Sequence, residues 1–129
     1  MEAETRLLHL AGELAALPPA EAVPAALRAL AAAYAPGGPL PRSMAQASLQ
    51  SHRDKTAVLA LAWARERVRL TLEEVLARTL ARGALPGSAE TRSWLILAAC
   101  EAMALEPPSA VADRLRALLE LTGYAADLA

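Results

Sequence analysis

Hydrophobic residues recur at helical spacing along most of the chain, in runs that prolines and glycines separate. The stretch from Asp54 to Arg82 contains neither breaker, and it predicts a helix of roughly 43 Å at 1.5 Å per residue. Side chains placed at 100° intervals along it form two apolar stripes on opposite sides. The first stripe contains Val58, Leu61, Val68, Leu72, Val75, Leu76 and Thr79, and the second contains Leu59, Trp63, Leu70, Ala77 and Ala81. Two apolar stripes indicate two packing neighbours, one of which can belong to a second chain.

The same reasoning predicts five more helices between the breakers. They are expected at residues 2–17, 19–34, 42–52, 89–105 and 110–122. Ser88 and Ser109 are suitable N-caps for the last two, and Gly123 is a typical residue just past a helix end. The sequence contains a single isoleucine, and scarcity of β-branched residues disfavours strands. We therefore predict an all-α bundle of about six helices that forms one domain over residues 1–129.

The helix expected at 89–105 is apolar on every side. Between Ser93 and Glu106 its only charged residue is Glu101, which either pairs with an arginine across a subunit interface or faces water. A helix that is apolar all round requires burial, and a bundle of this size has little interior to surround it. The pattern therefore indicates a second chain packed against this helix.

We predict a two-fold homodimer in which the helices at 54–82 and 89–105 join those of a partner chain in a four-helix bundle. The connection at Gly83 is short, so it should make the two helices antiparallel neighbours. The residues expected in or beside the interface are Leu70, Ala77, Ala81, Trp94, Leu97, Glu101 and Leu105. Alanines at the end of the second stripe would let another helix approach closely there.

Composition and charge exclude several classes of protein. The 129 residues are enough for one domain. The net charge is −1 and arginines alternate with glutamates, whereas nucleic-acid-binding domains usually carry a basic patch. No uncharged apolar run of about 18 residues exists, so no membrane span is expected. A lone Cys100, with Glu2 and Glu4 where a signal peptide would be basic, makes cytoplasmic location the expectation.

Residues that usually carry catalysis or bind metals are scarce. His9 and His52 are the only histidines and lie on different expected helices. The sequence contains no Glu-x-x-His pair that would indicate a metal site, and it contains no glycine-rich phosphate-binding loop. Cys100 lies in an apolar helix without a neighbouring base, so we interpret it as a buried, inert thiol. We expect no catalytic residue, metal or cofactor, and an enzyme or metal protein is the least supported class.

Aromatic and methionine side chains are the remaining candidates for ligand contact. Tyr34, Met44, Leu59 and Trp63 offer apolar surface with few charges nearby, which suits a small apolar effector. The alternative is that these four residues are ordinary core residues.

Four segments of the chain carry a family resemblance. They are PAEAVPAALRAL (19–30), ARERVRLTLEEVLARTLARGAL (64–85), SAETRSWLILAACEAMAL (88–105) and ADRLRALLELTG (112–123). In this order they resemble the C-terminal domain of the tetracycline-repressor (TetR) family of bacterial transcriptional regulators. The second and third are similar to that family's long eighth helix and its ninth helix. Ala102-Met103 departs from the Glu-Gly that many members have at this point.

The resemblance implies homodimerisation through the helices that flank Gly83 and a small-ligand cavity in each helical body. The family's N-terminal helix-turn-helix is absent from this sequence, so DNA binding is not carried over to the chain alone. The chain is then either a fragment cut at a domain boundary or a standalone protein that kept the sensor and dimerisation half. We expect an effector-sensing and homodimerisation module without catalytic activity. The alternative is a helical dimer that acts as a protein-interaction module without a small-molecule ligand.

Overall fold

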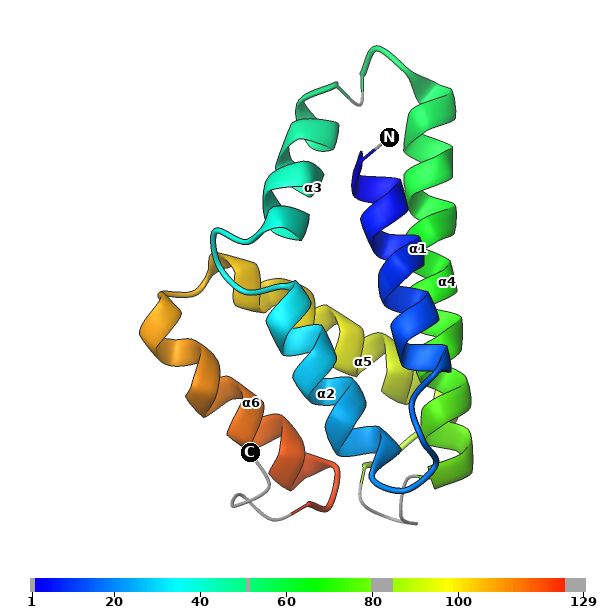
Figure 1. Ribbon diagram of the computed structural model, residues 1–129, viewed down its shortest axis with the longest axis vertical. Helices are drawn as coiled ribbons and strands as arrows, with labels where there is room; N and C mark the ends of the chain where they lie inside the picture. The colour runs from blue at the N-terminus through cyan, green and yellow to red at the C-terminus, as the bar shows by residue number, and fades with distance from the viewer. Residues whose placement is uncertain (1, 51, 80–84, 125–129) are drawn as a thin grey trace.

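The computed structural model describes residues 2–50, 52–79 and 85–124, and within these it contains helices but no strand (Figure 1). The six α-helices are α1 (Glu2–Ala15), α2 (Ala22–Ala33), α3 (Pro39–Gln50), α4 (Lys55–Thr79), α5 (Ala89–Ala102) and α6 (Val111–Leu121). Two 3-10 turns, η1 (Met103–Leu105) and η2 (Pro108–Ala110), lie between the last two helices. The prediction of an all-α bundle of about six helices is confirmed.

Helix α4 is the longest element, and α1 lies alongside it (Figure 1). The inward face of α4 corresponds to the first predicted stripe. Its buried residues are Ala64, Val68, Leu72, Val75 and Leu76. From α1, Leu7, Leu10 and Leu14 are buried in the same core, and full burial of each such side chain contributes about 1.5–3 kcal/mol. Val58 is 41% exposed, and it lines a cavity together with Met44 and Ala47 of α3.

A single hydrophobic core receives side chains from all six helices. Helix α2 contacts α1, α4, α5 and α6, and it is apolar along nearly its whole length. Figure 1 shows α5 running back obliquely from the end of α4 behind α2, with α6 returning beside α2. This arrangement buries Ile96, Leu97 and Cys100 of α5 and Leu119 of α6. The core therefore lies between α1 and α4 on one side and α5 and α6 on the other.

Two residues predicted to mark helix ends, Ser88 and Gly123, do so in the structure. Ser88 is the N-cap of α5, and its Oγ accepts a hydrogen bond from the backbone N–H of Thr91 at 3.2 Å. Gly123 follows α6 with a φ of +92°, the left-handed conformation that glycine adopts without strain. The helix predicted at 89–105 changes to a 3-10 turn at Met103.

Other helix boundaries differ from those predicted. Ser109 does not cap α6, because it lies inside η2 and the helix begins after Ala110. Helix α2 begins at Ala22 rather than at residue 19, since Glu21 has a left-handed backbone with a φ of 59°. Helix α3 begins earlier than predicted, at Pro39, where the fixed φ of proline suits a first helical turn. The predicted last turn of the long helix, residues 80–82, lies outside the described residues.

Neighbouring leucines on α1 provide a matched test of this packing. Leu7 is fully buried, whereas Leu8 is 44% exposed. Leu7→Ala should lower the free energy of unfolding by about 2–5 kcal/mol, because it leaves a cavity between α1 and α4. Leu8→Ala should cost less than about 1 kcal/mol. Urea unfolding followed by circular dichroism, at one protein concentration, measures both, and equal losses would contradict the described orientation of α1.

Candidate functional site

The outward face of α4 presents large apolar side chains to solvent. Trp63 is 71% exposed, Leu59 is 64% exposed and Leu70 is 41% exposed. Ala77 is exposed on the same face, two turns beyond Leu70. We call these four residues the outer stripe. Isolated apolar residues on a surface are ordinary, but a row of them along one helix is typical of an interaction surface.

Helix α5 and the turn after it add further exposed apolar surface. Trp94 is 53% exposed, Leu95 is 42% exposed and Leu105 in η1 is 91% exposed. Trp94 lines a small hollow of about 190 Å³ together with Glu66 and Arg69 of α4. The indole therefore lies beside the edge of α4 that carries Glu66 and Arg69. Exposed apolar side chains are thus present on α5 as well as on α4.

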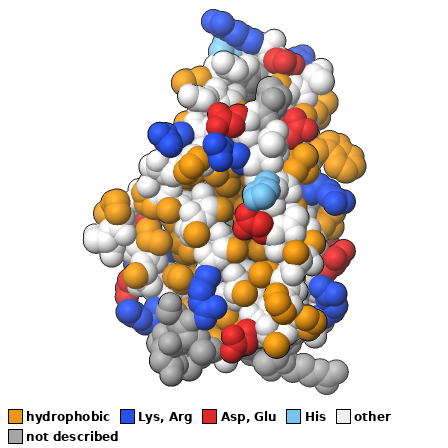
Figure 2. Space-filling view, viewed as in Figure 1, with side chains coloured by type: hydrophobic (Ala, Val, Ile, Leu, Met, Phe, Trp, Pro, Cys, Tyr) orange, Lys and Arg blue, Asp and Glu red, His pale blue; other side chains and the backbone are white. Residues whose placement is uncertain are grey.

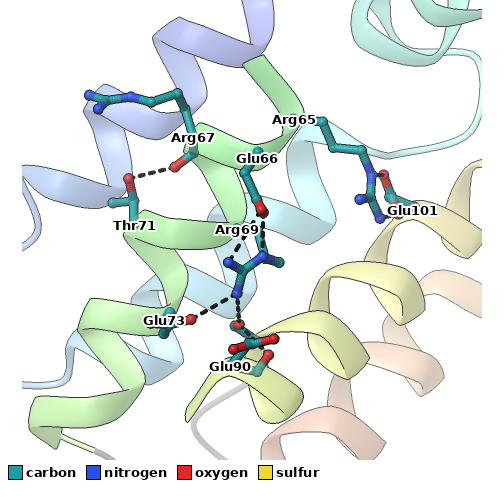
Figure 3. Close-up of polar contacts among 9 residues, drawn as sticks. Arg65, Glu66, Arg67, Arg69, Thr71, Glu73, Glu90 and Glu101 are labelled. Carbon is teal, nitrogen blue, oxygen red and sulfur yellow. Dashed lines mark hydrogen bonds and ion pairs between the residues drawn. The ribbon is translucent and has the colours of Figure 1, made fainter. Parts of the chain in front are cut away.

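Arg69 holds this edge of α4 against α5 (Figure 3). Its Nη1 donates to the Glu73 carboxylate at 2.8 Å and to Ser93 Oγ at 3.0 Å, and its Nε donates to the Glu66 carboxylate. The Ser93 hydroxyl in turn donates to the backbone carbonyl of Glu90 at 2.7 Å. The hydrogen bonds with Glu66 and then Glu73 raise the pKa of Arg69. Two carboxylates that border the outer stripe are thus held by one guanidinium.

An ion pair joins the same two helices farther along. Arg65 donates from Nε and Nη2 to the two carboxylate oxygens of Glu101, at 2.6 and 2.7 Å (Figure 3). This is the bidentate geometry in which arginine binds a carboxylate most strongly, and the hydrogen bond is the main reason that the pKa of Arg65 is raised. Glu101 therefore pairs with an arginine of the same chain. The sequence analysis had considered only an arginine across a subunit interface or exposure to water.

The predicted interface residues fall into distinct environments. Four of them are exposed, namely Leu70, Ala77, Trp94 and Leu105. The expectation for Leu97 is wrong, because this side chain is 0% exposed in the core and has no free surface to bury against a partner. Glu101 is half-buried in its ion pair with Arg65. Ala81 lies outside the described residues.

The structure does not bring the four predicted ligand residues around one cavity. Tyr34 is 3% exposed in the core, where burial is the main cause that raises the pKa of its phenol. Met44 lines a cavity of about 320 Å³ between α3 and α4. Leu59 and Trp63 belong to the outer stripe and face solvent. The expectation failed because α1 packs on the first stripe of α4. The second stripe, which contains Leu59 and Trp63, therefore faces solvent and does not line an interior cavity.

A different cavity was missed by the sequence reasoning. It is a groove of about 740 Å³ between α1, α2 and α3. Its apolar lining consists of Leu10, Ala29, Ala32, Ala33, Pro39 and Leu40, and its polar lining consists of Glu2, Thr5, Arg6, His9 and Glu13 from α1. Alanines on the α2 side leave this space open because their side chains are short. The alanine-rich end of the second predicted helix was the only sequence signal for it.

The described residues offer little conventional reaction chemistry. No group of three or more His, Cys, Asp or Glu side chains among them could hold a metal ion. Cys100 is buried, and burial is the main cause that raises the pKa of its thiol to about 12. Within the described ranges, no helix combines the length and apolarity needed to cross a membrane. On the face in Figure 2, acidic and basic side chains are interspersed among hydrophobic ones, so this face carries no basic area.

Comparison with known proteins does not identify the chain. No family model matches it, and no curated protein or solved structure is significantly similar to it. Its function must therefore be inferred from the outer stripe, from the groove and from the resemblance of its segments.

The role of Arg69 in joining α4 to α5 can be tested against a neighbouring arginine. Arg69→Met removes charge-assisted hydrogen bonds from a side chain that is only 12% exposed, and should lower the free energy of unfolding by about 2–3 kcal/mol. Arg67→Met, on the exposed face, should change it by less than about 0.5 kcal/mol. Urea unfolding measures both variants, and a neutral Arg69→Met would show that the cluster does not hold α5 in place.

The burial of Cys100 predicts slow chemical labelling. The thiolate is the reactive form, and a pKa raised from 9.0 to about 12 lowers the thiolate fraction at pH 8 about a thousandfold. Iodoacetamide at pH 8 should therefore label the folded chain far more slowly than the urea-unfolded chain. Mass spectrometry at timed intervals gives the two rates, and similar rates would place Cys100 at the surface.

Proposed function

We propose that this chain is a non-catalytic homodimerisation module, in which α4 and α5 of two copies form a four-helix bundle about a two-fold axis. The observation that carries this proposal is the outer stripe, together with the exposed Trp94 on the neighbouring helix α5. Exposed indole and leucine side chains along one helix cost free energy in water, and burying them against an identical surface removes that cost. A self-complementary stripe suits a second copy of the same chain.

The dimensions of α4 support an interface of sufficient size. Its 25 residues give a length of roughly 37 Å, and stable interfaces bury about 1,200–2,000 Å² in total. The outer stripe reaches from Leu59 near one end to Ala77 near the other, with α5 adding apolar surface beside it. Because Arg69 holds both Glu66 and Glu73 at one edge, those charges need no partner from the second chain.

We further propose that the module senses a small effector, as the ligand-binding half of a TetR-like regulator does. The support is the resemblance of residues 64–85 and 88–105, together with the presence of a groove of suitable volume between α1, α2 and α3. The alternative, a dimer that acts through protein contacts alone, gains support from the scattered positions of Tyr34, Met44, Leu59 and Trp63. DNA binding is not proposed for this chain alone.

A charge in the outer stripe should prevent dimerisation. Leu70→Glu places a carboxylate in the centre of the proposed interface, where an unpaired buried charge is very unfavourable. Leu49→Glu is the matched control, because Leu49 is 76% exposed but lies on α3. Sedimentation velocity at micromolar concentration should show a dimer for the wild type and for Leu49→Glu, and a monomer for Leu70→Glu.

Circular dichroism of the same samples establishes that each variant is folded. A folded wild-type monomer at these concentrations would overturn the proposed dimer. A dimer that persists in folded Leu70→Glu would show that the chains associate through another surface.

A further inference from the structure

The groove between α1, α2 and α3 has the size and lining of a small-molecule site. Its volume of about 740 Å³ is more than twice that of the cavity beside Met44, and it lies within the usual range of about 300–1,000 Å³. Leu10 and Leu40 form apolar surface from α1 and α3, and the alanines of α2 leave room between them. An apolar or aromatic body would therefore find contacts from three helices.

The polar edge of the groove comes from one face of α1, and its two ends differ in charge. At the first end, Arg6 donates from Nη2 and Nε to one carboxylate oxygen of Glu2, at 2.8 and 3.2 Å. The hydrogen bond and charge of Arg6, with a smaller contribution from Arg42 on α3, lower the pKa of Glu2. The basic groups near this end already face a carboxylate, so an anionic ligand would have to displace Glu2.

The second end of the polar edge carries a less firmly compensated carboxylate. Glu13 pairs with His9 at 2.9 Å, and both side chains are more than half exposed. This histidine is a counter-ion only when it is protonated, whereas an arginine is always charged. A positively charged ligand group could therefore approach Glu13 without breaking a permanent ion pair.

From this geometry we propose that the groove binds a lipophilic cation, with its apolar body against Leu10, Leu40 and the α2 alanines and its positive charge beside Glu13. The inference rests on the proposed effector-sensing function and names the chemical class of the effector. It concerns a surface formed by α1, α2 and α3, whereas the proposed dimer uses α4 and α5. The two proposals can therefore fail separately.

Tetraphenylphosphonium and tetraphenylborate provide a sharp test, because they have nearly the same shape and opposite charges. Isothermal titration calorimetry with the full chain should show that the phosphonium binds more tightly than the borate. Glu13→Gln should weaken phosphonium binding roughly fivefold, as expected for the loss of one partly exposed charge pair. Glu120→Gln on α6 removes the same charge outside the groove and should leave the affinity unchanged.

A second variant tests the location of the bound ion. Ala32 is exposed and lines the groove, so Ala32→Phe should fill the space and reduce phosphonium binding at least fivefold while the chain stays folded. Phosphonium binding unchanged in both Ala32→Phe and Glu13→Gln would place the ion elsewhere, such as on Trp63, and would overturn the inference. Tighter binding of the borate would overturn the assignment of a cation.

Sedimentation of the same samples separates the two proposals. A dimer that binds neither ion contradicts the groove inference and leaves the proposed dimer intact. A monomer that binds the phosphonium with the expected response to Glu13→Gln supports the groove inference and contradicts the dimer.

Discussion

The packing of α1 against the inward face of α4 is the contact on which the rest of the structure depends. Leu7 and Leu14 are buried there with Val68 and Leu72, so this side of α4 receives a neighbour from the same chain. The four residues of the outer stripe, on the opposite side, are exposed and receive no such covering helix from the described part of the chain. The outer stripe is thus a direct consequence of a helix with two apolar faces placed in a bundle that covers only one of them.

Two arginines of α4 determine how α5 lies against it. Arg65 and Arg69 each reach across to α5, and their side chains are only partly exposed. The Arg65–Glu101 ion pair and the Arg69–Ser93 hydrogen bond both cost desolvation and add modest net stability. We therefore attribute to them the orientation of α5 more than the strength of its packing. With Glu101 and Ser93 fixed toward α4, Trp94 is left exposed beside Glu66 and Arg69. These polar contacts therefore determine which side of the apolar helix α5 faces solvent.

The sequence predicted what depends on local periodicity and failed where tertiary placement decides. The buried stripe with Val68 and Leu72 and the cap at Ser88 follow from spacing over a few residues, which any helix imposes. Leu97 was misplaced because a helix that is apolar on all sides has no polar face, so its sequence does not show which side is buried. The Arg65–Glu101 pair joins residues 36 apart in sequence, so no single segment carries a signature of it. The groove is formed by three helices together, and the alanines of α2 are its only local signal.

Helix α1 contributes to both the groove and the packing of α4. Its Leu10 lines the groove and is buried in the core, while α1 as a whole lies along α4 (Figure 1). A ligand in the groove therefore contacts the helix that positions α4, and α4 carries the outer stripe on its other side. A ligand that tightened α1 against α4 would fix the orientation of that stripe and so favour the dimer that we propose. Because coupling between two binding events is reciprocal, a partner bound to the stripe would then raise the affinity for the ligand by the same factor.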